Sequence, residues 1–116
     1  MKLTSIGQKY LVRKLELKST IKKVIEVKIG FPQKFPDSTD YFCPYQILGL
    51  GNENIDYCGG IDEVQAVLLS MERIGEILYA SDEYKNGDLH WEGSTEGNLG
   101  FPVFDSSRLL SSLKYI

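Results

Sequence analysis

The chain contains few of the residues from which disulfide scaffolds and metal centres are built. Of its 116 residues, two are cysteine and one is histidine. Two cysteines are too few for a disulfide framework. The separation of Cys43 and Cys58 matches no usual zinc motif, and His90 lies far from both in sequence. We therefore expect no metal or other cofactor, and two reduced thiols of the kind found in cytoplasmic proteins.

Long apolar segments are also lacking. No run approaches the roughly 20 residues that a membrane-spanning helix needs, and the first ten residues have no apolar stretch typical of a secretory signal. We expect a cytoplasmic protein with no membrane contact. What is present, 42% hydrophobic and 25% charged residues, is typical of a globular protein, and the length predicts a single domain over residues 1–116.

Charge is distributed unevenly along the chain. Residues 1–34 hold nine lysines and arginines against two acidic residues, whereas residues 35–116 hold four against fourteen. Such a split places opposite fields on different parts of one domain, and fields of this kind steer partners. The alternative is that the lysines solvate one face of a hairpin and discourage edge-to-edge pairing. Nucleic-acid binding is disfavoured because the chain as a whole is acidic.

The first half of the chain reads as three strands. Residues 11–18 and 24–29 alternate between apolar and polar side chains, which predicts an antiparallel hairpin with Leu15, Leu17, Ile25 and Val27 facing inward. Glycine and proline then predict a loop over residues 31–40. Residues 41–50 predict a third strand. Gly49 and Gly51 predict a turn rather than a phosphate-binding loop, because no helix follows directly, and a second loop is expected between this turn and the helix.

One long helix is the clearest local prediction. Asp62 is placed to cap it, and the apolar spacing carries it to about Tyr79. The stripe expected to face the sheet comprises Val64, Val67, Leu68, Met71, Ile74, Gly75 and Leu78. Glu72 and Glu76 lie one turn apart and favour a solvated acidic face over an acid–base couple.

The sequence after the helix predicts short elements. Residues 82–87 read as a turn, residues 89–92 as a short strand with His90 at the surface, and residues 93–100 as a flexible loop. Residues 100–104 are expected to close over the core. Asp105 or Ser106 is a candidate cap for a terminal helix through Leu109, Leu110 and Leu113. The fold class is therefore α+β: an antiparallel sheet packed against one long helix, with short C-terminal elements.

Three motifs carry a resemblance to a known family. They are Cys43-Pro44-Tyr45-Gln46-Ile47 with Gly49-Leu50-Gly51, Gly60-Ile61-Asp62 with Val64-Gln65-Ala66, and Leu99-Gly100-Phe101-Pro102. Together they resemble a family of small bacterial proteins catalogued as a domain of unknown function, over residues 9–102. The resemblance implies a cytosolic bacterial protein of this layout and no established activity, with residues 105–116 as an extension.

The first functional hypothesis is a binding protein, not an enzyme, of the immunity type. Small size, no evident catalytic set and a strongly acidic portion suit an inhibitor that covers a cationic, nuclease-like bacterial toxin domain. The expected oligomeric state is a monomer or a weak homodimer. The candidate partner-binding residues are acidic positions with two aromatic anchors: Glu53, Asp56, Tyr57, Asp62, Glu63, Glu72, Glu76 and Tyr79.

The second hypothesis is a small enzyme or ligand-binding domain beneath the glycine turn. Its candidate residues are Cys43, Tyr45, Gln46, Gln65 and His90. A cysteine nucleophile needs a nearby base, so this hypothesis depends on the fold bringing Cys43 and His90 together. The two glutamines have a simpler alternative role, which is to satisfy backbone groups where the turn meets the helix.

Overall fold

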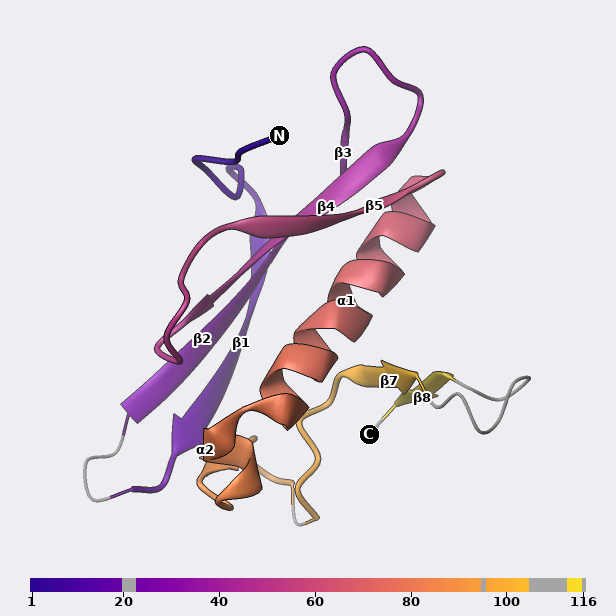
Figure 1. Cartoon of the computed structure of the whole chain (residues 1–116). Coiled ribbons are helices and arrows are strands. Elements are labelled where there is room, and N and C mark those ends of the chain that lie inside the picture. Colours follow the sequence, from indigo (N-terminus) through magenta and orange to yellow (C-terminus); the bar gives the residue numbers. More distant parts are fainter. Residues whose placement is uncertain (20–22, 95, 105–112, 116) are drawn as a thin grey trace.

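The computed structural model describes residues 1–19, 23–94, 96–104 and 113–115, and it has two layers (Figure 1). One layer is an antiparallel sheet built from β1 (Tyr10–Leu17), β2 (Lys23–Gly30), β3 (Gln33–Lys34), β4 (Tyr41–Leu48), β5 (Asp56–Gly60) and β6 (Leu89–His90). The other is α1 (Glu63–Ala80), followed by α2 (Asp82–Lys85). A separate two-stranded sheet joins β7 (Pro102–Phe104) to β8 (Leu113–Tyr115). The expected α+β class is confirmed.

The hairpin of β1 and β2 forms as the alternation predicts. Leu15 lies opposite Ile25, and Arg13 lies opposite Val27, in an antiparallel register that runs the full length of both strands. Residues directly opposite each other point to the same face, so Leu15, Ile25 and Val27 share the inner face and are fully buried. The predicted connection at residues 19–22 lies largely outside the described residues.

Strand β4 lies between β2 and β5. It pairs with β2 through Tyr45–Leu48 and with β5 through Tyr41–Tyr45, and both pairings are antiparallel. Strand β3 pairs with Tyr41 and Phe42, so part of the predicted loop over residues 31–40 is a strand. The segment before α1 was likewise expected to be loop and contains β5. Both expectations were wrong because pairing with β4 overrides the low strand propensity of glycine and proline in these segments.

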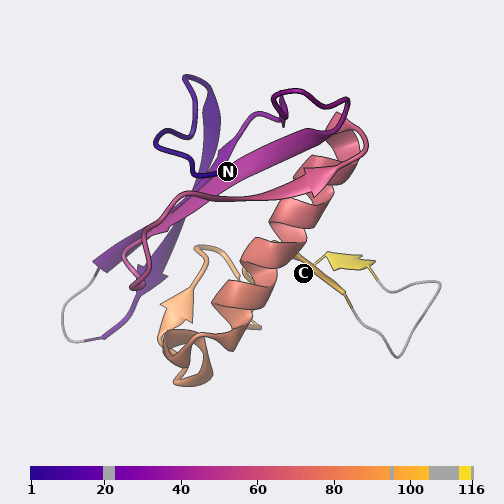
Figure 2. The ribbon, with the colours of Figure 1, turned by 45° about the horizontal axis from the view of Figure 1, so that its top comes forward.

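Helix α1 begins as expected. The Asp62 carboxylate accepts from the backbone N–H of Gln65 at 2.7 Å, and the Gln65 side chain accepts from the N–H of Ile61 at 2.8 Å. These reciprocal bonds satisfy free donors at the helix N-terminus. In Figures 1 and 2 the helix runs obliquely across one face of the sheet, and no helix of the described residues covers the opposite face.

The buried side of α1 differs from the predicted stripe in its first half. Ala66, Ser70, Ile74 and Leu78 are buried, whereas Val64 is 66% exposed. The oblique crossing brings the helix backbone against β5, where a Cβ on Gly60 would lie 2.5 Å from the Ala66 nitrogen. Small residues therefore face the sheet at this end, and the larger Val64 and Leu68 are turned outward.

Short elements follow the helix. The predicted turn at residues 82–87 contains α2, capped by the Ser81 hydroxyl, which accepts from the N–H of Tyr84 at 3.2 Å. The expected terminal helix does not extend to Leu113, because Leu113 belongs to β8 and pairs with Phe104. Its other positions, including Asp105, Ser106, Leu109 and Leu110, lie outside the described residues.

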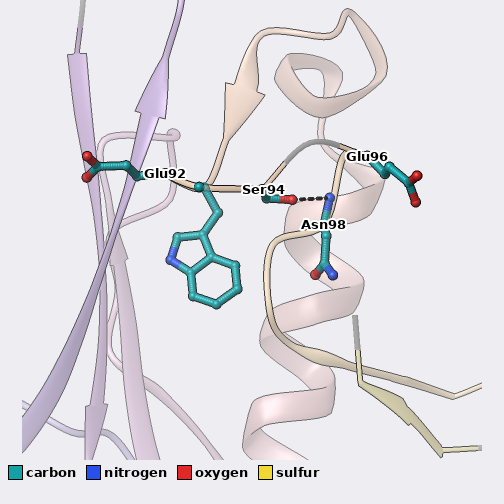
Figure 3. Close-up of a pocket in the computed structure, with 6 residues that line it drawn as sticks. Glu92, Ser94, Glu96 and Asn98 are labelled. Atoms are coloured by element: carbon teal, nitrogen blue, oxygen red, sulfur yellow. Dashed lines mark hydrogen bonds between the residues drawn. The ribbon is translucent and has the colours of Figure 1, made fainter.

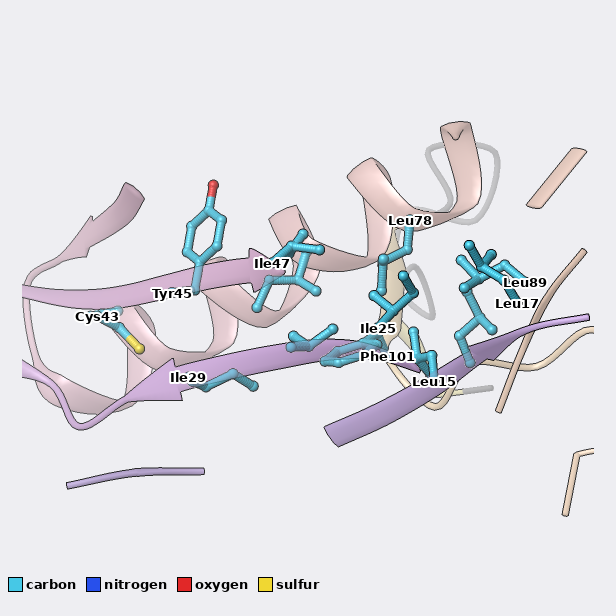
Figure 4. Close-up of a cluster of buried hydrophobic side chains, with 14 residues drawn as sticks. Leu15, Leu17, Ile25, Ile29, Cys43, Tyr45, Ile47, Leu78, Leu89 and Phe101 are labelled. Atoms are coloured by element: carbon cyan, nitrogen blue, oxygen red, sulfur yellow. The ribbon is translucent and has the colours of Figure 1, made fainter. Parts of the chain in front are cut away.

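The core fills the space between the sheet and α1 (Figure 4). Leu15, Ile25, Ile47 and Leu78 meet there, and Phe101 enters from the segment before β7 with no exposed surface. The expectation that residues 100–104 close over the core is confirmed. Figure 4 shows Phe101 below Ile25 and next to Leu15, so the C-terminal part of the chain completes the hydrophobic cluster.

The uneven charge of the sequence becomes a difference between the two layers. Lys14 and Lys28 alternate with the buried Leu15 and Val27, so their side chains project from the uncovered face of the sheet, and those of Glu16 and Glu26 project from the same face. Helices α1 and α2 lie on the other face. Between residues 62 and 85 this layer carries six acidic residues against two basic ones, Arg73 and Lys85.

Candidate functional site

The acidic residues in and around the two helices are together called the acidic helix surface. Asp62 and Glu63 lie at the start of α1, Glu72 and Glu76 in its second half, and Asp82 and Glu83 in α2. Glu72 and Glu76 fall about half a turn from the buried positions Ser70 and Ile74, on the side of α1 that faces away from the sheet. Two leucines at positions 68 and 69 are also exposed there. The surface therefore combines negative charge with accessible apolar area.

Arg73 is the basic residue of α1. Its guanidinium donates to the Glu76 carboxylate at 3.0 Å, and both side chains are about half exposed. Partial burial, and then the neighbouring charge of Glu76, raises the pKa of Glu72. An exposed ion pair of this type contributes little stability. Its main effect is to offset part of the negative charge at the middle of α1.

A polar cleft of about 260 Å³ lies beside the acidic helix surface, between α1 and the connection from β4 to β5. Tyr45, Asp56 and Arg73 contribute polar groups to it, together with Asn52 and Asn54. Burial raises the pKa of Tyr45, so its hydroxyl stays protonated at neutral pH. The cleft offers hydrogen-bond donors and acceptors beside apolar side chains, a combination suited to contact with a polar partner surface.

Gln46 and Glu53, which the sequence proposed as candidate binding residues, hold the wall of this cleft in place. The Gln46 amide donates to the carbonyl of Glu53 at 2.8 Å, and the Glu53 carboxylate accepts from the N–H of Gly49 at 2.8 Å. Gly49 has a φ of 105°, a left-handed conformation that favours glycine and closes the turn. Gln46 and Gln65 thus both bind backbone groups, which is the simpler of the two roles considered for them.

The eight predicted partner-binding residues do not form one surface. Asp62, Glu63, Glu72 and Glu76 share α1, and Asp56 reaches them across the cleft that Arg73 also lines. Tyr57 lies elsewhere. Neighbouring residues of a strand point to opposite faces, and Cys58 on β5 faces α1, so Tyr57 faces the uncovered side of the sheet. Its ring packs there on Phe42, with 5.6 Å between the ring centroids.

Tyr79 is also engaged within the protein. Its hydroxyl accepts from the N–H of Leu99 at 2.9 Å, and its ring meets Tyr84 edge-on at 4.8 Å between centroids. The hydrogen bond ties the segment before β7 to α1, and the ring contact ties α1 to α2. The two aromatic residues expected as anchors thus also make contacts within the protein, and their part in binding a partner stays a prediction. Leu68 and Leu69, which sequence reasoning assigned to the core or passed over, are exposed near Glu72, and Ile61 and Val64 are exposed beside Asp62 and Glu63.

The residues of the enzyme hypothesis are not brought together. Cys43 lies on β4 and His90 on β6, and β2 and β1 separate these strands. Three strand spacings amount to about 14 Å. Burial raises the pKa of the Cys43 thiol to about 11, so it is protonated at neutral pH, and its Sγ donates to the carbonyl of Gly30 at 3.3 Å. His90 instead contacts the carbonyl of Gly87 at 2.8 Å.

A second hollow, of about 350 Å³, lies in the loop after β6 (Figure 3). Trp91, Glu92 and Ser94 line one part of it, with Gly93, Glu96 and Asn98. The Ser94 hydroxyl accepts from the N–H of Asn98 at 3.1 Å, so this loop, expected to be flexible, is held by a hydrogen bond. Figure 3 shows Glu92 and Glu96 pointing in opposite directions, so their carboxylates do not converge on one ligand.

No sequence pattern predicted the contact that anchors this loop. The Arg13 guanidinium lies 4.1 Å from the Trp91 ring centroid and 4.9 Å from that of Phe101. It also donates to the carbonyl of Gly100 at 2.6 Å. Burial lowers the pKa of Arg13. Gly100 has a φ of 75°, and a side chain there would collide with Trp91 and Arg13.

Within the described part of the chain, no His, Cys, Asp and Glu side chains gather in a group of three or more that could hold a metal ion. The helices of the same residues include none that is long and apolar enough to cross a membrane. The expectations of no cofactor and no membrane contact stay predictions.

The fold defines an α+β domain in which one long, acidic helix covers one face of an antiparallel sheet. The chain belongs to the family described as Domain of unknown function (DUF6968), whose model matches residues 11–103. This range agrees with the extent of the resemblance expected from the three motifs. No curated protein matches the chain. No solved structure matches it either.

Proposed function

We propose that this protein is a non-enzymatic, cytoplasmic inhibitor of the immunity type, which neutralises a basic, nuclease-like bacterial toxin domain by covering its surface. The acidic helix surface carries the proposal. It presents six acidic residues against two basic ones over residues 62–85, beside the exposed Leu68 and Leu69. A nuclease binds phosphates and is therefore basic around its active site, so an acidic partner gains a faster encounter.

The separation of charge between the layers supports the same proposal. Lys14 and Lys28 project from the uncovered face of the sheet, away from the acidic helix surface. Glu16 and Glu26 share that face, so the sheet carries mixed charge while the helices are acidic. A cationic partner would therefore be attracted mainly to the helices, which orients the encounter before contact. The exposed leucines would then supply apolar area at the centre of the interface, where desolvated contacts contribute most of the affinity.

Co-expression with the neighbouring toxin provides the test. A gene for a large secreted toxin is expected immediately upstream, and its C-terminal domain should kill cells unless this protein is present. The wild-type chain should protect and should co-purify with that domain. The double variant Glu72→Lys with Glu76→Lys should lose protection, because it places positive charge on the surface that meets the toxin.

A matched control reverses two charges on the other layer. Lys14→Glu with Lys28→Glu changes the net charge by the same amount in the opposite direction and should keep full protection. Absence of protection and of co-purification by the wild-type chain would contradict the proposal. Equal loss in both double variants would place the contact outside the acidic helix surface.

A further inference from the structure

Strand β1 leaves most of its outer edge without a neighbouring strand. On its inner edge it pairs with β2 along its whole length. On its outer edge β6 pairs with Glu16 and Leu17, and among the described residues no other strand pairs with this edge. The segment Tyr10 to Lys14 is therefore an open edge of the sheet, the kind of surface to which a further strand adds.

The register determines which backbone groups point outward. The Lys9 carbonyl accepts from the N–H of Phe31 at 3.4 Å, which makes these two residues a hydrogen-bonded pair. In an antiparallel ladder such pairs alternate, so Leu11 and Arg13 also direct both backbone groups toward β2. The N–H and C=O groups of Tyr10, Val12 and Lys14 consequently point away from β2. No described residue bonds to them.

The side chains of this edge favour pairing with another strand over exposure to water. Leu11 is 61% exposed and Val12 is 44% exposed, and Tyr10 beside them is also exposed. Aromatic and branched residues favour strands, and they are unusual on an edge that must stay free. Lys14 at the end of the segment is the kind of residue that discourages pairing, but its effect depends on what lies opposite it.

We propose that two copies of this protein associate through antiparallel pairing of their β1 edges, with Val12 on the two-fold axis. This register overlaps all three outward-pointing residues. It places Val12 opposite Val12 and Tyr10 opposite Lys14 of the second copy, and each pair exchanges two backbone hydrogen bonds. Lysine meets an aromatic ring across the interface, an attractive combination. A register centred on Lys14 would oppose two lysines.

The same register covers Leu11. On the helix side of the sheet, Leu11 of one copy lies opposite Arg13 of the other, whose guanidinium already rests against Trp91 and Phe101. The most exposed of the edge residues would thus gain an apolar neighbour. Association joins the two sheets into one and leaves both acidic helix surfaces free, so the inference is independent of the proposed function.

Sedimentation analysis of the full chain over a range of concentrations, at low and high salt, tests this inference. The wild-type chain should associate into dimers, and the dimer should persist at about 500 mM salt, because charge attraction is screened there. Val12→Lys would oppose two lysines on the axis and should raise the dissociation constant about tenfold or more. Val24→Lys is the matched control. Val24 is 54% exposed and lies on the same face of the sheet as Val12, but on β2 and therefore away from the β1 edge.

Backbone amide exchange supplies a second readout that needs no variant. Protection of the Tyr10, Val12 and Lys14 amides should increase with protein concentration, while the Leu11 and Arg13 amides should be protected at every concentration. A dissociation constant of about 1 mM is roughly the weak limit of specific association. A wild-type chain that stays monomeric at about this concentration would overturn the proposal, and the β1 edge would then be available to a strand of another protein. Equal effects of Val12→Lys and Val24→Lys, or a dimer that dissociates in salt, would also overturn it.

Discussion

Ser70 shows how one buried hydroxyl can join three elements. Its Oγ donates to the carbonyl of Cys43 on β4 at 2.7 Å and accepts from the N–H of Cys58 on β5 at 3.1 Å. Both strands are thereby fastened to α1 at one point. Buried backbone groups that lose such a partner have no water to replace it, so the loss of these two bonds lowers the free energy of unfolding more than the loss of exposed bonds would.

Replacement of Ser70 by alanine should therefore destabilise the protein by about 1–3 kcal/mol, the usual cost of leaving buried polar groups unpaired. Unfolding in urea, followed by circular dichroism, measures the change. Ser38→Ala is the control, because the Ser38 hydroxyl also accepts a backbone N–H, that of Asp40, but at an exposed position. An equal loss of stability in both variants would show that the bonds of Ser70 have no special role.

At the scale of elements, Arg13 holds the loop after β6 against the sheet. Its position on the inner face of β1 is unusual for a charged residue, and three features compensate for its burial: the Trp91 ring, the Phe101 ring and the carbonyl of Gly100. Arginine suits this position because its planar guanidinium stacks on rings while its N–H groups donate in the plane.

Arg13→Met should free this loop and lower stability by about 2 kcal/mol, from lost hydrogen bonds to a charged group and lost ring contacts. Trp91 is the sole tryptophan of the chain, so its fluorescence reports on the loop directly. The emission should shift to longer wavelength as the indole becomes solvated. Lys14→Met, one residue along β1 but on the uncovered face, should leave the emission unchanged; a similar shift there would contradict the assignment.

Elements whose signals are local could be predicted from the sequence. Helix α1 was predicted because Asp62 caps it and its apolar spacing is regular, and the hairpin because its alternation is continuous. Strand β5 could not be predicted, since two of its five residues are glycine. Its formation depends on pairing with β4 and on the close approach of α1 at Gly60, and both are long-range effects.

The candidate site could be predicted in part for the same reason. The positions of Glu72 and Glu76 follow from helical periodicity, and the structure places both on the outward side of α1. The aromatic anchors could not be assigned, because exposure of a tyrosine depends on distant partners. Tyr79 is engaged by Leu99, and Tyr57 by Phe42, across separations that no local pattern encodes.

At the scale of the whole molecule, the helix layer is acidic and the sheet carries mixed charge, so the helix layer can attract a cationic partner before contact. Long-range attraction raises the rate of encounter and is screened within about 8 Å at physiological salt. The ion pair of Arg73 and Glu76 is exposed and contributes little to folding. Charge reversal on the acidic helix surface should therefore alter association and leave the thermal unfolding midpoint nearly unmoved.

The most direct test of this account is the association rate with the toxin domain, measured by stopped flow from about 50 to 500 mM salt. The rate should fall steeply as salt rises, and the dissociation rate should change little. Glu72→Lys with Glu76→Lys should slow association at low salt, whereas Lys14→Glu with Lys28→Glu should leave it equal or faster. An association rate that stays flat across the salt range would contradict the account, because an encounter steered by the acidic helix surface must respond to screening.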